Sequence, residues 1–186
     1  MKTTFWVIYI VWFAFEVILG RVRRSSQADQ KREDKHSLLF IWLAIAVAMP
    51  LSSTVSSLYR APIAHGVWIS YVGLCLIVAG MIARYLVIRS LGKMFTVDVA
   101  IRAGHKLKTD GIYSIVRHPS YSASWLSFVG FGISLNNWLS LIIVSGLVLI
   151  AFLYRISVEE RVLTEEFGEG YKEYRKRTRA IVPFIY

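Results

Sequence analysis

Five long apolar segments dominate this 186-residue sequence and restrict what it can fold into. A helix of about 20 mainly apolar residues spans the hydrocarbon core of a bilayer. With 55% hydrophobic residues, the chain carries more apolar surface than a soluble domain of this length can bury. The pattern therefore predicts an all-α integral membrane protein with five transmembrane helices. The segments cover residues 3–19, 38–58, 66–83, 120–135 and 138–154.

The last two segments are short for a membrane span, and only Asn136 and Asn137 separate them. Asparagine tolerates tight-turn conformations, so we predict a helical hairpin formed by spans four and five. Each of its helices is expected to extend past its apolar stretch at the end away from the turn. Gly130 and Gly132, within the fourth segment, are expected to allow close packing between helices.

The basic residues predict how the spans are oriented. The chain has 22 lysines and arginines against 12 acidic residues, a balance that would suggest nucleic acid in a soluble protein. Here the basic residues flank apolar segments, so we expect a membrane surface and no nucleic acid as a partner. Residues 21–37, 84–117 and 155–179 hold 20 of the 22, and five spans place all three regions on one side. The positive-inside rule then predicts the N-terminus outside and the C-terminus in the cytoplasm.

Two polar regions on the predicted cytoplasmic side are candidates for a site. The connection 92–119 is longer and more polar than a simple loop needs to be. Beyond the fifth segment the pattern continues as a helix, in which Arg155 and Glu159 share one face. Polar groups beside an apolar bundle indicate a site for a molecule with a polar head and an apolar body. We therefore divide the chain into a two-span N-terminal membrane region, 1–65, and a core, 66–186, that contains the polar loop and cytoplasmic C-terminal helices.

Each of these residues also has an ordinary structural interpretation. Arg155 and Glu159 can be a plain ion pair on an exposed helix face, and histidines 105 and 118 can be satisfied residues at the interface. Arg117 can simply bind a lipid phosphate group at the membrane surface. Glu16, inside the first segment, can pair with a neighbouring helix or extend to the outer face. The four histidines are scattered and there is one cysteine, so we expect no metal site.

Three motifs in the second half of the chain point to a family. They are Arg-His-Pro-Ser-Tyr at 117–121, Glu-Glu at 159–160 and Phe-Gly-Glu-Gly-Tyr at 167–171. In this order the sequence resembles the isoprenylcysteine carboxyl methyltransferase family, within a wider group that includes phospholipid methyltransferases. The resemblance covers roughly residues 84–186; each motif alone is weak, and the ordered set is specific.

The resemblance implies an S-adenosylmethionine-dependent methyltransferase that methylates the carboxylate of a C-terminal isoprenylcysteine or a similar lipid-like acceptor. The prenylated substrate would come from the bilayer and the cofactor from the cytoplasm. Arg155 matches a substrate-binding arginine and is implied, with Glu159, to be catalytic. Asp98 departs from the family, because some relatives have an amide near that position. The implied cofactor contacts are His105, Lys106, Leu107, Lys108, Tyr113, His118, Pro119, Ser120, Tyr121 and Glu159.

Rival functions remain open at this level. A phospholipid N-methyltransferase would keep the cofactor but methylate an amine. A membrane sterol-type reductase would use NADPH with a similar C-terminal motif, and a small transporter or scaffold would need only the spans. The sequence leaves the physiological methyl acceptor and the source membrane undetermined.

Overall fold

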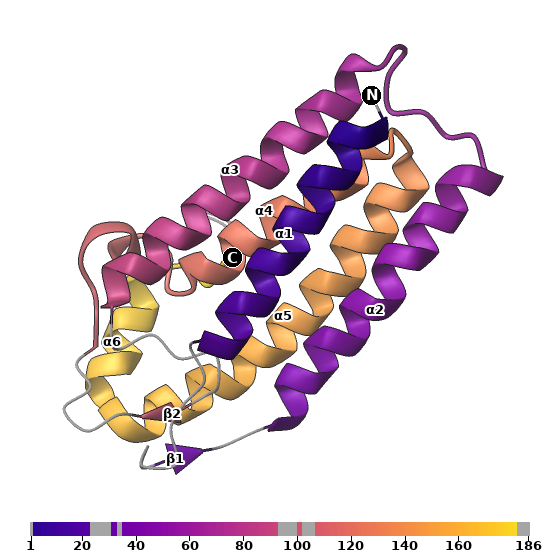
Figure 1. Cartoon of the computed structure of the whole chain (residues 1–186). Helices are drawn as coiled ribbons and strands as arrows, with labels where there is room; N and C mark the ends of the chain where they lie inside the picture. The colour runs from indigo at the N-terminus through magenta and orange to yellow at the C-terminus, as the bar shows by residue number, and fades with distance from the viewer. Residues whose placement is uncertain (1, 23–30, 33–34, 93–99, 102–106, 182–186) are drawn as a thin grey trace.

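The computed structural model describes residues 2–22, 31–32, 35–92, 100–101 and 107–181. Successive long helices run in alternate directions, so that β1 (Lys31–Arg32), β2 (Ala100–Ile101) and α6 (Glu169–Arg177) gather at one end of the bundle (Figure 1). The long helices are α1 (Lys2–Val22), α2 (Lys35–Leu58), α3 (Trp68–Leu91), α4 (Pro119–Ser134) and α5 (Trp138–Phe167). A 3-10 helix, η2 (Gly111–Ser114), precedes α4, and α6 (Glu169–Arg177) follows α5.

Besides the helices and their connections, the described residues include one small antiparallel pair of strands and one isolated parallel bridge, between Val116 and Arg179. β1 (Lys31–Arg32) pairs with β2 (Ala100–Ile101), with Lys31 opposite Ile101. This pairing joins the connection between α1 and α2 to the connection between α3 and α4. The two basic connections therefore meet at the same end of the bundle.

Helices α2, α3 and α5 are long and apolar enough to cross a membrane, whereas the apolar stretch of α1 and the whole of α4 are shorter. Large apolar side chains cover the outside of the bundle. Trp6, Leu43, Ile82 and Ile142 are between 55% and 65% exposed, a surface suited to lipid rather than water. The predicted helical membrane architecture is confirmed, and the count of five spans remains a prediction.

The expected extension beyond the apolar stretch is correct for α5 and wrong for α4. Pro119 is the first residue of α4; it lacks an N–H group and disfavours helical backbone in the residue before it. His118 accordingly has φ −120° and ψ 57°. The helix is therefore 16 residues long, or roughly 24 Å at the usual rise per residue.

Glycines bring α3 and α4 into close contact. A Cβ atom on Gly130 would lie 2.7 Å from the carbonyl oxygen of Gly73, and one on Gly80 would lie 2.7 Å from that of Ala123. Gly132 has the same role toward α5, because its Cβ would lie 2.7 Å from Leu141 Cα. The predicted use of Gly130 and Gly132 in helix packing is confirmed.

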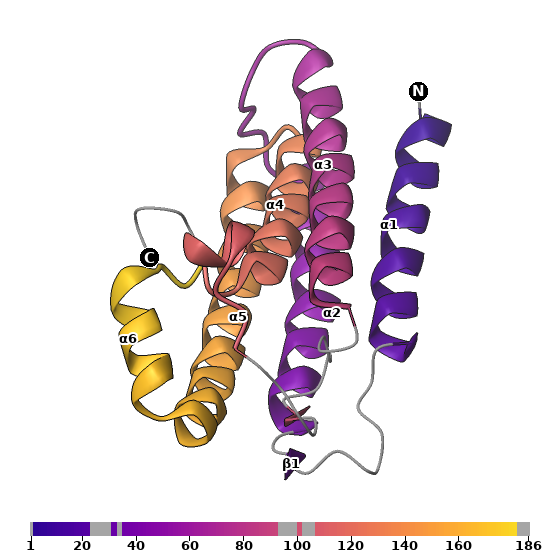
Figure 2. The same cartoon turned by 90° about the vertical axis from the view of Figure 1, so that its left-hand side faces the viewer.

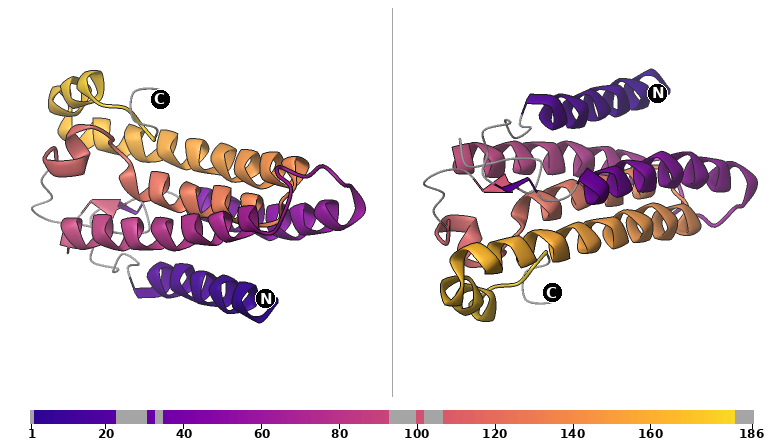
Figure 3. Two further views of the ribbon diagram at one scale, coloured as in Figure 1. Left: turned by 90° about the horizontal axis from the view of Figure 1, so that it is seen from above. Right: turned by 90° about the horizontal axis from the view of Figure 1, so that it is seen from below.

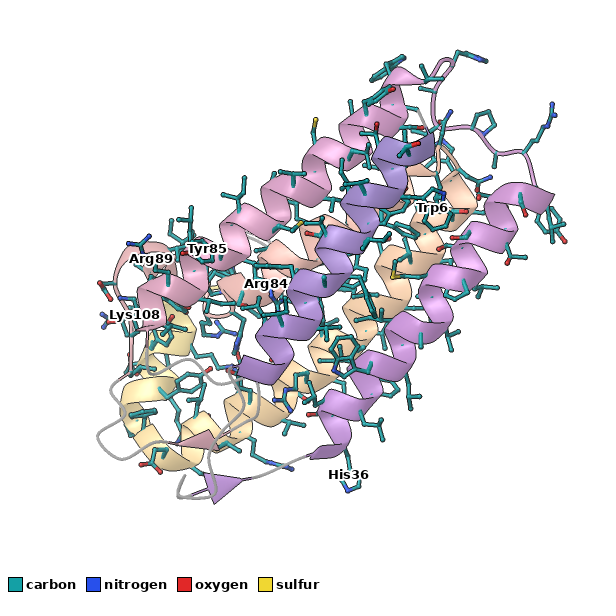
Figure 4. The ribbon with its side chains drawn as sticks, in the orientation of Figure 1. Trp6, His36, Arg84, Tyr85, Arg89 and Lys108 are labelled. Atoms are coloured by element: carbon teal, nitrogen blue, oxygen red, sulfur yellow. The ribbon has the colours of Figure 1, made fainter. Side chains whose placement is uncertain are left out.

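Helix α1 lies at the edge of the bundle beside α3, on the opposite side from α5 (Figure 3). Its Trp12 ring packs against Phe128 of α4, with ring centroids 4.8 Å apart. Glu16 Oε2 lies 3.3 Å from Arg84 Nη2 on the side of α3 that faces α1 (Figure 4). Of the two alternatives for Glu16, pairing with a neighbouring helix is therefore correct, and it satisfies a charge within an apolar helix.

A short connection with two asparagines joins α4 to α5. Asn136 has φ 47°, a left-handed conformation that asparagine tolerates. Its Oδ1 accepts hydrogen bonds from the backbone N–H groups of residues 63 and 64, at 3.0 and 3.1 Å. Asn137 Nδ2 donates to the carbonyl of Tyr59 at 2.6 Å. Both side chains thus hold the α4–α5 turn against the connection between α2 and α3.

Candidate functional site

The candidate site is built where the start of α4 meets the extended part of α5 and the segment after α6. Helix α6 turns back and lies beside the end of α5 (Figure 2). The segment that follows pairs with the residues before α4: Arg117 N–H donates to Arg179 O at 2.8 Å, and His118 N–H donates to Ala180 O at 3.0 Å. These backbone bonds fix residues 117–118, so the motif before α4 has a defined conformation.

Glu160 is the centre of a buried polar cluster. Its Oε1 lies 2.7 Å from Arg117 Nε and 3.3 Å from His118 Nε2, and its Oε2 lies 3.3 Å from Arg175 Nε. The side chains of Glu160 and Arg117 are only 9% and 8% exposed. Arg117 also donates to the carbonyl of Thr178, beyond α6. Because buried charges must be paired, this cluster fastens the start of α4, α5 and the C-terminal segment together.

The neighbouring acid, Glu159, has a different environment. Its side chain is 32% exposed, and its Oε2 accepts a hydrogen bond from the Tyr121 hydroxyl at 3.1 Å. The same oxygen lies 3.9 Å from His118 Nδ1, so the His118 ring stands between the two glutamates. Glu160 therefore forms ion pairs within the protein, with Arg117 and Arg175, whereas the carboxylate of Glu159 remains partly accessible.

Arg155 lies one turn before Glu159 and is 1% exposed. Its Nη1 donates to the hydroxyl of Ser37 in α2. The arginine also acts electrostatically on the phenol of Tyr121, as does Glu159. The alternative of a simple ion pair on an exposed helix face is therefore wrong for Arg155, because its guanidinium is inside the bundle.

Three buried tyrosines, from the 3-10 helix η2 and from α6, lie near the two glutamates. Burial, followed by the charge of Glu159, raises the pKa of Tyr113, and burial with the charges of Glu160 and Glu159 raises that of Tyr171. Burial also raises the pKa of Tyr174 to about 12, and its hydroxyl donates to the carbonyl of Tyr113 at 2.6 Å. All three phenols therefore stay neutral at physiological pH, and the Tyr174 hydroxyl ties α6 to the 3-10 helix before α4.

The sequence-predicted site residues fall into three groups. His118, Tyr121, Arg155 and Glu159 come together as described. In the described part of the chain, Lys108 makes no hydrogen bond or ion pair with these four residues. Its Nζ pairs with Asp110 Oδ1 at 3.0 Å, and Leu107 precedes it in the same connection. Ser120 accepts a hydrogen bond from Arg84 Nη1 through its carbonyl, at 3.2 Å. His105, Lys106 and Asp98 lie outside the described residues.

Sequence reasoning gave no role to several residues that build this site. Glu160 and Arg117 were visible as parts of the motifs, yet only the fold shows that they pair with each other. Arg175 and Ser37 carry no sequence signal, because each reaches the site from a distant element. Within the described ranges, no group of three or more histidine, cysteine, aspartate or glutamate residues is arranged to hold a metal ion.

The site offers a partly open carboxylate, a phenol and an imidazole beside a buried guanidinium. A carboxylate accepts hydrogen bonds from hydroxyl or ammonium groups, whereas a guanidinium binds anions such as carboxylates. The two groups stand one helical turn apart on α5. This arrangement suits two ligands, or two parts of one ligand, with opposite polarity.

Comparisons with known proteins match this part of the chain. Residues 72–165 match the model of the isoprenylcysteine carboxyl methyltransferase family. Protein-S-isoprenylcysteine O-methyltransferase B of Arabidopsis thaliana is 42% identical over 120 residues, which are 63% of this chain and 61% of that protein. The corresponding methyltransferase of Schizosaccharomyces pombe is 36% identical over 114 residues, 60% of this chain and 47% of that protein.

The fold has a solved counterpart. A structure of the eukaryotic intramembrane Ras methyltransferase, isoprenylcysteine carboxyl methyltransferase, matches with a TM-score of 0.58 and 21% sequence identity, over 96% of this chain and 67% of that one. At this identity the likeness concerns the fold alone. The match spans about three fifths of the length of the plant relative.

The different environments of the two adjacent glutamates lead to a prediction about stability. Glu160→Gln leaves the buried Arg117 guanidinium without its charged partner, and should lower the free energy of unfolding by on the order of 3 kcal/mol. Glu159→Gln, at a partly exposed carboxylate, should stay close to wild type. Thermal and denaturant unfolding of both variants in detergent, followed by tryptophan fluorescence, measures the difference. Equal losses would show that Glu160 does not hold the cluster together.

Proposed function

Because the chain belongs to the isoprenylcysteine carboxyl methyltransferase family, we propose that it is an S-adenosylmethionine-dependent enzyme that methylates the carboxylate of a C-terminal isoprenylcysteine. The chain is an integral membrane protein, and its polar site adjoins the apolar bundle. The observation that carries the proposal is the placement of Arg155 and Glu159 one turn apart, at the point where α5 leaves its apolar stretch. There, one residue suits an anionic acceptor and the other suits a polar cofactor.

The donor set fits the proposed cofactor. When bound, S-adenosylmethionine supplies a methyl group on a sulfonium, whose carbon–sulfur bond breaks as the bond to the acceptor oxygen forms. Glu159 would accept hydrogen bonds from ribose hydroxyls or from the ammonium group, and its partial exposure leaves room for them. Tyr121 orients that carboxylate from α4. His105, Lys106, Leu107, Lys108, Tyr113, His118, Pro119 and Ser120 are proposed as further cofactor contacts.

Arg155 would hold the acceptor. Its planar guanidinium can bind a carboxylate with two hydrogen bonds and stays charged when buried. One of its nitrogens donates a hydrogen bond to the hydroxyl of Ser37 in α2, which holds the guanidinium in place. Methyl transfer depends mainly on positioning two reactants in line, so a guanidinium held in this way contributes by orienting the carboxylate oxygen.

We also propose the orientation of this enzyme in the membrane. All of α1–α5 would cross the bilayer, with the N-terminus outside, α4 and α5 as a hairpin, and the site on the cytoplasmic side. This placement puts the three basic regions in the cytoplasm. The cofactor would enter from the cytoplasm and the prenyl chain from the bilayer. Residues 1–65 would form a membrane region attached to the methyltransferase core, 66–186.

A binding and activity measurement tests the proposed function. The purified protein should bind S-adenosylhomocysteine in calorimetry and methylate N-acetyl-farnesylcysteine. Glu159→Ala should weaken the binding of S-adenosylhomocysteine at least about tenfold, which corresponds to roughly 1.4 kcal/mol of binding free energy. Binding of NADPH in its place would indicate a reductase. Methylation of phosphatidylethanolamine without methylation of the prenylcysteine would indicate a phospholipid N-methyltransferase.

The role of Arg155 has its own test. Arg155→Lys keeps the charge but loses the bidentate geometry, so it should bind S-adenosylhomocysteine normally while methyl transfer to N-acetyl-farnesylcysteine falls at least about tenfold. Single-turnover rates at saturating cofactor isolate the transfer step, and the unfolding midpoint controls for folding. Near-equal rates in a normally folded variant would contradict an acceptor-binding role.

Cysteine labelling in intact cells tests the orientation. In a Cys75→Ser background, which removes the chain's one cysteine, His65→Cys should react with an impermeant maleimide and Lys172→Cys should not. Both positions are exposed in the structure, so accessibility reports the side of the membrane. Lysing the cells should make Lys172→Cys reactive. Labelling of both positions from outside would overturn the proposed topology.

A further inference from the structure

A hollow lies on the face of α5 that is turned away from Arg155 and Glu159. It is a groove of about 560 Å³ between α5 and the segment that includes α6 and residues 178–180. The α5 residues that line it include Leu153, Ser157, Arg161 and Thr164, which recur at helical spacing along one stripe. By the same periodicity this stripe is more than a third of a turn away from Glu159. The groove therefore faces away from Arg155 and Glu159, and it shares Glu160 and Arg117 with the cluster that supports the proposed methyl-transfer site.

The groove is basic. Its lining includes arginines 117, 161, 175 and 179 and two acids, Glu160 and Glu165. Glu160 is shared by Arg117 and Arg175, inside the cluster that holds the site together. Arg161 and Arg179 have exposed side chains, and neither makes an ion pair with another described residue. The guanidinium groups of these two arginines can therefore bind an anion in the groove.

One end of the groove is apolar and continues into the outer surface of the bundle. Leu153, Ile156 and Ala180 line this end. Along α5 the same stripe then carries Leu139, Ile142 and Ile150, which are 44%, 63% and 59% exposed. A surface of this kind contacts acyl chains when α5 crosses a membrane. The basic end of the groove thus continues into exposed leucine and isoleucine side chains along one face of α5. A phospholipid has the matching order, with a charged head group followed by an acyl chain.

The depth of the two arginines also suits a lipid head group. Arg179 accepts the backbone hydrogen bond of Arg117, directly before α4 begins, so it lies at the membrane end of the groove. Arg161 is seven residues beyond Tyr154, where the apolar stretch of α5 ends, or roughly 10 Å at the usual helical rise. Arginine side chains extend several ångströms back toward the bilayer, while the polar layer on each side is roughly 5–8 Å thick.

We propose that this groove binds one anionic phospholipid, with its phosphate between Arg161 and Arg179 and an acyl chain along Leu153, Ile150 and Ile142. Guanidinium groups bind phosphate through paired hydrogen bonds. A zwitterionic lipid carries a cation that two arginines repel. The proposal concerns binding on the outer side of α5 and is independent of the methyl-transfer activity.

Native mass spectrometry of the full chain in detergent, titrated with dioleoyl-phosphatidylglycerol, tests the proposal. The double variant Arg161→Gln/Arg179→Gln should bind the first equivalent of this lipid at least about tenfold more weakly than wild type. The matched control is Arg89→Gln/Arg177→Gln, which removes the same charge from exposed positions at the same end of the molecule but outside the groove lining. It should bind as wild type does. Equal unfolding midpoints without lipid establish that all three proteins fold alike.

Two further ligands identify the source of the phosphate. Dioleoyl-phosphatidylcholine should bind wild type at least about tenfold more weakly than phosphatidylglycerol, and glycerol phosphate should fail to displace the bound lipid at millimolar concentration. Equal losses in the groove and control variants would overturn the proposal, because they would indicate a general effect of net charge. Displacement by glycerol phosphate would also overturn it, by showing an anion site that does not require the acyl chain.

Discussion

The ion pair between Arg117 and Glu160 is the interaction on which the rest of the site depends. Both side chains are nearly buried, so each charge is stable only beside the other. The pair joins residues that come before α4 to residues late in α5, and Arg117 extends the connection to Thr178. Without it, the backbone pairing of residues 115–118 with 179–180 would lose a buried side-chain link, and His118 would lose the Glu160 oxygen that its ring contacts.

The same interaction explains why two adjacent acids can have different roles. Consecutive residues on a helix point about 100° apart. Since Glu160 is fixed toward the arginines, Glu159 must point toward Tyr121 and the face that also carries Arg155. The orientation of the proposed ligand-binding carboxylate therefore follows from a neighbour that touches no ligand. The motif of two glutamates therefore consists of one available acid, Glu159, followed on the next face by one structural acid, Glu160.

The sequence predicted those features that depend on local patterns. Apolar segments predicted the helical membrane fold, and Gly130 and Gly132 predicted a close helix contact, because both signals lie within one segment. The start of α4 differs from the expectation drawn from its short apolar segment, because Pro119 prevents the helix from extending upstream. Ser37 beside Arg155, and Arg175 beside Glu160, could not be predicted. Each contact joins residues from separate elements, and nothing in a single sequence records which helices will be neighbours.

Helix α5 connects two chemically distinct surfaces. On one face, the packing of α2 and α4 buries Arg155 and leaves Glu159 partly open. On the opposite face, α6 and the segment after it form a basic groove that continues into exposed apolar surface. The two faces have Glu160 in common, because it lines the groove and also contacts His118. A change that displaced Arg175 would therefore affect His118 through the single carboxylate of Glu160. Arg161 and Arg179, in contrast, make no ion pair with that carboxylate among the described contacts, so replacing them should leave Glu160 in place.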